Sequence, residues 1–309
     1  MRRQAVLVLV LVLAGAAPAA SLLVGARGRF LVSPARSSRL HQLHSVATPA
    51  DDEVSTATTT ATTTTTTKRV PIGSAPELKL EGDSTVETPY QRAVVATHFL
   101  TTAAILWSAS TQFPAFSSPL DALPLILTVT ASIVLGDLGT GIFHWSVDNY
   151  GSIKTPVFGS VCHAFQGHHD APWTITFRSF CNNVFKIAYG TIPALLLVAV
   201  AVPAGAVLTK VFLTLFINWW LISQEFHKWA HMRSVPPLVK FLQDSGVVLS
   251  RKEHGLHHTS PFESNYCILT GVCNPLLDAT GFFRALEKIV YRLTGNESNT
   301  WKADPSLRL

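Results

Sequence analysis

The sequence predicts an all-α membrane protein of about four transmembrane helices, with a histidine-rich two-metal site at one membrane face. Three observations predict this fold class. Only 14% of the 309 residues are charged, whereas a typical soluble domain carries roughly 25%. Long stretches without charged residues recur between residues 93 and 226. Nine of the twelve histidines lie between residues 144 and 258, and eight of them form one pattern in which several are three or four residues apart.

The first 70 residues are predicted to be a targeting region, followed by a membrane domain at residues 71–309. Residues 1–20 combine two arginines, a short apolar core and a run of small residues, which is the order of a secretory signal peptide. Residues 21–50 contain four arginines and no acidic residue, as is typical of an organelle transit peptide. A threonine-rich linker follows. This two-part address indicates a plastid bounded by extra membranes, and a plain ER signal is the alternative.

The apolar stretches are long enough to cross ~30 Å of hydrocarbon as helices at about 1.5 Å per residue. The first expected helix covers residues 93–112, and the second runs from near Pro124 through 143. The stretch 187–209 holds the third, and a turn at Pro203 separates it from a fourth helix at roughly 206–226. Lys210 lies near the start of the fourth helix and is expected to extend toward the interface.

The basic residues gather on one side of this predicted bundle. Helices two and four end on that side, and the loop 144–185 and the tail 227–309 hold almost all of the lysines and arginines. The positive-inside rule makes this face cytosolic or stromal. A cleaved ER signal would instead leave it lumenal, so the charge bias favours a plastid membrane. The basic residues form no runs with interleaved aromatics, so binding of nucleic acid is not supported.

The eight histidines form four groups that the predicted topology places at the same face. Spacings of three and four residues put imidazoles on one side of a helix. Their number exceeds the four ligands of a tetrahedral zinc ion, and imidazole also suits iron, copper and nickel. Two metal ions fit the number, and two irons fit the pattern. The predicted ligands are His144, His168, His169, His227, His231, His254, His257 and His258.

Carboxylates accompany these histidines. Asp137 and Asp148 lie on the helical stripe of His144, and Asp148 is the better candidate for orienting an imidazole or for direct ligation. Asp137 lies deeper, where a charge requires a partner. Glu225 and Glu253 neighbour histidines in sequence, but neighbouring residues of a helix do not face each other, so both are interpreted as solvated.

Other candidates are interpreted as structural or left without a role. His98, alone inside the first helix, is expected to be a hydrogen-bonded core histidine, and His163 is assigned no role. The four cysteines have no CxxC spacing, so neither a zinc ribbon nor a dense disulfide framework is expected.

Several motifs resemble, in the same order, those of the Kua-type lipid desaturase family. They are the runs 136–139, 144–151, 168–169, 173–176, 227–231, 242–244, 251–258 and 266–267, within a similarity that covers roughly residues 85–295. One branch of that family, plasmanylethanolamine desaturase, makes the vinyl ether of plasmalogens in the ER. The other, plastid palmitate desaturase, puts a trans double bond at position 3 of palmitate on phosphatidylglycerol. Residues 165–169 and 182–183 are similar to the plastid branch.

The resemblance implies an oxidoreductase, an O2-dependent acyl-lipid desaturase. Its implied cofactor is two iron ions (Fe2+/Fe3+) held by the eight histidines, with Asp148 at an acidic position important in the family. Its implied substrate is phosphatidylglycerol of a plastid (chloroplast) membrane. The sequence has no CxxCH haem motif and no glycine-rich dinucleotide fingerprint, so electrons are expected from a separate protein. That donor is expected to be ferredoxin in a plastid, or cytochrome b5 in the ER.

Three rival interpretations stay open. The first is an ER plasmanylethanolamine desaturase with the same chemistry and another substrate. The second is a related membrane hydroxylase, which lipid product analysis would distinguish. The third is a non-enzymatic zinc-binding or transport protein, which the metal content of the purified chain would reveal.

Overall fold

The computed structural model describes residues 75–78 and 80–308, and these residues form helices and loops without a strand. The all-α prediction is therefore confirmed over this part of the chain. The predicted targeting region lies outside the described residues, so it stays a prediction.

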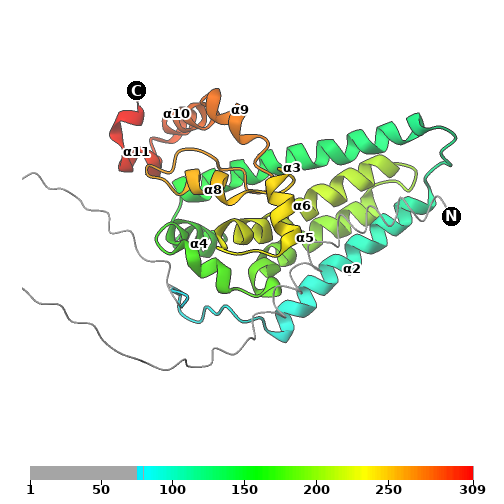
Figure 1. Ribbon diagram of the computed structural model, residues 1–309, viewed down its shortest axis with the longest axis horizontal. Coiled ribbons are helices and arrows are strands. Elements are labelled where there is room, and N and C mark those ends of the chain that lie inside the picture. The colour runs from blue at the N-terminus through cyan, green and yellow to red at the C-terminus, as the bar shows by residue number, and fades with distance from the viewer. Residues whose placement is uncertain (1–74, 79, 309) are drawn as a thin grey trace, which may run out of the picture.

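Four long helices lie side by side and form the body of the molecule (Figure 1). Each is long and apolar enough to cross a membrane, which confirms the four predicted spans. They are α2 (Pro89–Thr111), α3 (Leu123–Asn149, preceded by the 3-10 turn η1, Pro119–Ala122), α5 (Phe180–Ala201) and α6 (Val207–His231). Helix α6 is the most buried of the four, because α2, α3 and α5 all pack against it.

Local sequence signals explain where these helices begin and end. The Thr88 hydroxyl accepts a hydrogen bond from the backbone N–H of Gln91, and the Gln91 side-chain oxygen accepts one from the backbone N–H of Thr88. This reciprocal cap begins α2. Pro124 occupies the first turn of α3, where its missing N–H costs nothing. Helix α5 ends at Ala201, two residues before Pro203, as expected.

Helices α2 and α5 begin four and seven residues before their predicted starts, at Pro89 and Phe180. Helices α3 and α6 extend past their predicted C-terminal ends, and both of these extensions carry histidines. Helix α3 continues six residues beyond 143 to Asn149, and α6 continues five residues beyond 226 to His231. The reason is that these final turns are buried beneath short helices, so polar side chains there still contribute to packing. The hydropathy of a span alone does not show that short helices cover its final turns.

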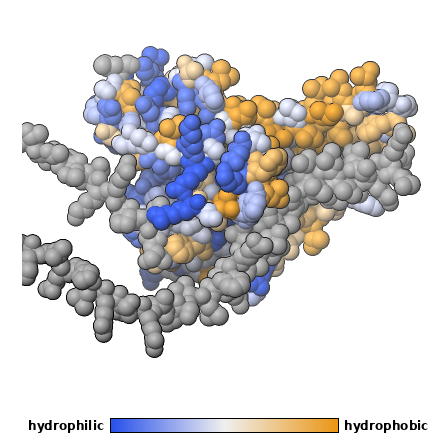
Figure 2. Space-filling model, in the orientation of Figure 1, coloured by the Kyte–Doolittle hydropathy of each residue, from blue (hydrophilic) through white to orange (hydrophobic). Residues whose placement is uncertain are grey.

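The short helices gather at the end of the bundle where α3 and α6 end (Figure 1). They are α4 (Gly159–His168), η2 (Pro172–Phe177), α7 (Pro237–Asp244), α8 (Arg251–His257), α9 (Asn274–Ala279), α10 (Phe282–Thr294), α11 (Asn299–Ala303) and η3 (Pro305–Arg308). Figure 2 shows hydrophilic residues concentrated at this end and hydrophobic residues over the long helices. Which membrane face this end occupies stays a prediction.

Lys210 does not extend to the surface as expected. Its side chain is 5% exposed. The reason is its register: it shares one face of α6 with Val207 and Thr214, three residues before and four after, and both of those are buried.

Candidate metal centre

Five histidines form the first group at the end of the bundle. One ring nitrogen of each lies within 4.8 Å of the others, and the members are His168, His227, His231, His254 and His258. The Nε2 atom of His231 lies 2.8 Å from those of His168 and His254, and 3.2 Å from that of His227. The His258 and His254 Nε2 atoms are 3.1 Å apart.

The spacing of these nitrogens fits a bound metal ion. Metal–imidazole bonds of about 2.0–2.1 Å place ligands at right angles roughly 3 Å apart, close to the distances in this group. Hydrogen bonds alone do not account for the arrangement. Each neutral imidazole has only one N–H, and the buried Nδ1 atoms of His227 and His254 also have no partner among the described residues.

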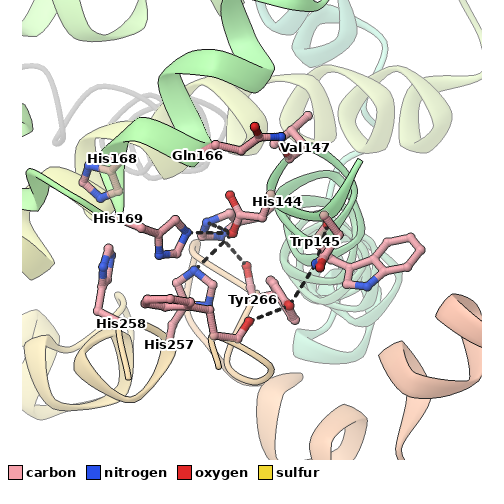
Figure 3. A network of polar contacts seen from close by, with 12 residues as sticks. His144, Trp145, Val147, Gln166, His168, His169, His257, His258 and Tyr266 are labelled. Carbon is pink, nitrogen blue, oxygen red and sulfur yellow. Dashed lines mark hydrogen bonds and ion pairs between the residues drawn. The ribbon is translucent and has the colours of Figure 1, made fainter. Parts of the chain in front are cut away.

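The second group combines three histidines with one carboxylate. Asp148 Oδ2 lies 3.2 Å from His144 Nε2, 3.0 Å from His169 Nε2 and 3.3 Å from His257 Nε2. Figure 3 shows the three imidazoles pointing toward a common centre. Rings of the two groups are in contact: the centroids of His169 and His258 are 4.8 Å apart.

The hydrogen bonds of the second group leave nitrogen lone pairs directed at the carboxylate. The Nδ1 of His144 lies 3.0 Å from the backbone oxygen of Tyr266, and the Nδ1 of His257 lies 2.9 Å from that of Ser264. An oxygen can only accept, so each Nδ1 carries the proton and, in a neutral ring, Nε2 does not. Both Nε2 atoms are buried without a hydrogen-bond partner, facing Asp148. The nitrogen lone pairs and the negatively charged carboxylate repel each other. A cation between them would remove this repulsion, so the residues fit a metal ion.

Burial keeps four histidines of the short helices α4 and α8 and their caps neutral, as ligation requires. Burial and then the neighbouring imidazoles hold the pKa of His168, His254 and His258 far below the usual range. The same causes lower the pKa of His257 to about 4. These rings therefore present lone pairs to a metal at neutral pH.

The helices position the ligands through the spacings seen in the sequence. His144 and Asp148 are four residues apart on α3, and His227 and His231 are four apart on α6. His254 and His257 lie on α8, where Ser250 and Glu253 form a reciprocal N-terminal cap. Glu253 is therefore a helix-capping residue, which corrects its interpretation as simply solvated.

His168 and His169 do not lie in a loop as the sequence interpretation placed them. His168 ends α4, and His169 is the capping residue that follows. The short helix is held by Gln166, whose side-chain amide donates to the backbone oxygen of Val147, 3.0 Å away on α3. Its ten residues are too few to recognise from an apolar pattern.

Asp137 has the partner that its depth in the predicted bundle required. Its Oδ1 accepts from the backbone N–H groups of Thr270 and Gly271 at 2.8 and 3.0 Å, and its Oδ2 accepts from that of Cys273 at 3.0 Å. This carboxylate therefore fixes the segment after Tyr266 against α3. The backbone oxygen that orients His144 is positioned by the same segment.

Glu225 was expected to be solvated and is fully buried, which corrects that interpretation. It lies 2.6 Å from the Lys228 ammonium, and it accepts hydrogen bonds from the Trp229 indole and the Asn183 amide. Its neighbours three and four residues along α6, together with α5, enclose it. His98 is hydrogen-bonded to Asn218, as expected of a core histidine.

Sequence reasoning assigned no role to Tyr266, which lies beside the centre. Its side chain is completely buried, and its ring centroid is 5.0 Å from that of His257. The Tyr266 hydroxyl donates to the backbone oxygen of Phe262 and accepts from the Asn149 amide. Its only signal was membership of a shared motif. His163 belongs to neither group.

The helices and the converging side chains define the class of protein: a multi-pass helical membrane protein with a histidine-rich site able to hold metal. A family model described as the lipid desaturase domain matches residues 133–301, which include every residue of both groups. The chain belongs to the lipid desaturase domain family. No solved structure matches it.

Curated relatives agree with this assignment. Fatty acid desaturase 4-like 1, chloroplastic, of Arabidopsis thaliana is 42% identical over 177 residues, which cover 57% of this chain and 59% of the relative. Fatty acid desaturase 4-like 2, chloroplastic, of the same plant is 37% identical over 224 residues, covering 72% and 79%. Plasmanylethanolamine desaturase 1 of Mus musculus is 32% identical over 182 residues, covering 56% and 67%.

The chain spans little more than half the length of two of these plant proteins: 59% of fatty acid desaturase 4-like 1, and 53% of fatty acid desaturase 4, chloroplastic, which is 44% identical over 177 residues. The chloroplastic relatives and the four apolar helices support a multi-pass plastid membrane protein.

Proposed function

We propose that this protein is a di-iron lipid desaturase of a plastid membrane. It uses O2 and external electrons to introduce a trans double bond at position 3 of palmitoyl chains on phosphatidylglycerol. The observation that carries the proposal is the meeting of eight imidazoles and Asp148 in two adjacent groups at one end of an apolar helix bundle. Iron at this site supplies the oxidation of an unactivated C–H bond, which protein side chains alone do not perform.

The site residues have distinct tasks in this proposal. The five-histidine group holds one metal, and His144, His169, His257 and Asp148 hold the other. The carboxylate supplies the negative charge that the five-histidine group lacks, so the two positions differ in charge. The backbone oxygens of Tyr266 and Ser264 fix the orientation of two imidazoles, as outer ligands do in metal sites. Burial excludes water from the reacting carbons.

The regiochemistry and headgroup are proposed from the resemblance to the plastid branch of the family, and the plastid relatives support that branch. Those relatives are 37–44% identical and carry chloroplastic fatty acid desaturase names. The targeting region, with its transit-like composition, supports the same location. The expected electron donor is ferredoxin.

A second candidate is an ether-lipid desaturase. It is supported by plasmanylethanolamine desaturases of Myxococcus xanthus and Mus musculus, which are 33% and 32% identical. Cytochrome b5 would then be the expected donor, in an ER membrane.

Lipid analysis after expression tests both candidates. The full chain is expressed in a plastid-containing host that lacks trans-3-hexadecenoate, and the lipids are analysed by mass spectrometry. We expect trans-3-hexadecenoate on phosphatidylglycerol, and none with a His257→Ala variant that still inserts into the membrane. A vinyl-ether product instead would favour the second candidate. Hydroxylated lipid, or zinc without iron in the purified chain, would contradict both.

A further inference from the structure

A continuous row of aromatic side chains leads from the membrane-spanning part of α6 to the metal-site histidines. Its members, here called the aromatic track, are Phe212, Phe216, Trp220, Phe143 and Phe165. The first three are four residues apart on α6, so they lie on one face of that helix. Phe143 belongs to α3 and Phe165 to α4.

Adjacent rings of the track are in contact. The centroids of Phe212 and Phe216 are 6.0 Å apart, and those of Phe216 and Trp220 are 6.1 Å apart. Trp220 lies 5.7 Å from Phe143, which lies 5.9 Å from Phe165. These distances are within the range of packed aromatic pairs.

The end of the track at Phe165 reaches the candidate metal centre. The Phe165 ring centroid is 5.3 Å from that of His144, in the group that includes Asp148. Phe143 directly precedes His144 on α3. The track is therefore continuous with the site. This continuity distinguishes it from other apolar patches on the bundle.

The track lies on the outer side of the α3–α6 contact. The opposite stripe of α6, which includes Val211, Leu215 and Ile222, is buried in the bundle. All five track residues are only partly buried. Because α3 and α6 are predicted to span the membrane, the track residues are therefore accessible from the hydrocarbon part of the bilayer.

A glycine allows Trp220 to lie against the backbone of α3. A Cβ added at Gly139 would lie 2.9 Å from the Trp220 ring, closer than real side chains approach. The two helices thus leave room for a flat indole between them, level with the turn below His144. Gly139 is four residues before Phe143 on the same face of α3.

We propose that the aromatic track binds the acyl chain of the lipid substrate, with its methyl end toward Phe212 and its ester end beside His144. This inference rests on the proposed function and deepens it. The centre lies where the spans end, at the level of a bilayer at which lipid ester groups lie. A chain lying along the track therefore brings the carbons nearest its ester to the metals while the rest stays in the membrane. Double bonds close to the headgroup follow from this placement.

Two variants test the track without touching a metal ligand. Trp220→Ala removes the largest contact surface, and we expect kcat/KM for palmitoyl lipid to fall about tenfold, equivalent to about 1.4 kcal/mol of lost binding. Phe212→Ala lengthens the far end, and we expect the ratio of 18-carbon to 16-carbon products to rise several-fold. Trp107→Ala is the matched control, because Trp107 is a 62% exposed tryptophan on α2, outside the track.

The measurements separate this proposal from the proposed function. Iron per chain and amount in the membrane are determined for every variant, together with product chain lengths, in the same host as the wild type. If the wild type makes trans-3 lipid and both track variants match Trp107→Ala in rate and chain-length profile, the track is wrong and the function stands. If the wild type desaturates no lipid, both fail. Should Trp220→Ala lose iron, Trp220→Phe, which keeps an aromatic ring, must restore the metal and retain the intermediate rate.

Discussion

Asp148 is the single residue on which the proposed second metal position depends most. Its Oδ2 is within 3.3 Å of three imidazole nitrogens, and its Oδ1 is buried without a partner among the described residues. No other carboxylate belongs to either group. Among the described residues it is thus the one anionic side chain of the two groups that could balance the charge of a bound cation.

Replacing Asp148 with asparagine should remove metal selectively from its own group. The change keeps the shape and removes the charge, so we expect iron to fall from about two to about one ion per chain and desaturation to be lost. Iron is measured by mass spectrometry on protein purified in detergent. His163→Ala is the control and should keep both ions. Two ions per chain in Asp148→Asn would contradict the assignment.

The neutral histidines predict how the stability of the metal-free protein depends on pH. The folded pKa of His257 is about 4, below its ordinary value of 6.5, so between these values the unfolded chain binds more protons. Stability is therefore full above pH 6.5 and falls as the pH is lowered toward 4. Thermal unfolding of the metal-free protein in detergent should show Tm decreasing across this window. A flat profile from pH 7 to 5 would contradict burial of neutral imidazoles.

At the scale of elements, α8 has a large effect for its length because its seven residues carry two of the proposed ligands and its C-cap residue is a third. So short a helix has little stability by itself, and its reciprocal cap compensates. Ser250 Oγ accepts from the backbone N–H of Glu253 at 3.1 Å, while the Glu253 carboxylate accepts from that of Ser250 at 3.3 Å.

Ser250→Ala should loosen α8 and weaken metal binding without changing any ligand. Loss of a helix N-cap costs about 1 kcal/mol, so we expect a lower Tm and faster iron loss to a chelator. Ser250→Thr keeps the hydroxyl and should behave close to the wild type. Equal chelation rates for all three proteins would show that the cap does not support the site.

At the scale of the whole molecule, distant parts of the chain are joined at the site end of the bundle. Asp137 of α3 binds three backbone N–H groups of residues 270–273. The Asn149 side chain accepts from the backbone of Thr300, and the Asn299 amide donates to the backbone oxygen of Asp148. The C-terminal segments thus cover the end of α3 that carries the ligands.

Asp137→Asn should destabilise this covering and the centre beneath it. Hydrogen bonds to charged groups contribute roughly 1.5–3 kcal/mol each, and the amide replaces one acceptor oxygen with a donor. We expect a marked loss of Tm and of folded protein in the membrane, measured by fluorescence-detected chromatography. Asp121→Asn, at an exposed turn before α3, is the matched control. A Tm equal to that of the control would mean that the three contacts contribute little.

The sequence alone was sufficient for the four spans. It also predicted the eight histidines and Asp148, which the structure brings together in two groups. A long apolar stretch predicts a membrane-spanning helix directly. Spacings of three or four residues predict which side chains share a helix face, and neither prediction needs tertiary information. The same pattern also indicated that Asp137 needed a partner.

Only the tertiary structure decided which histidines lie together in each group, which backbone groups bind Asp137, and that Glu225 and Lys210 are buried. These features depend on contacts between residues up to 136 positions apart, such as Asp137 and Cys273, which leave no periodicity in the sequence. Helical spacing fixes directions within one element, whereas packing between elements fixes where those directions meet.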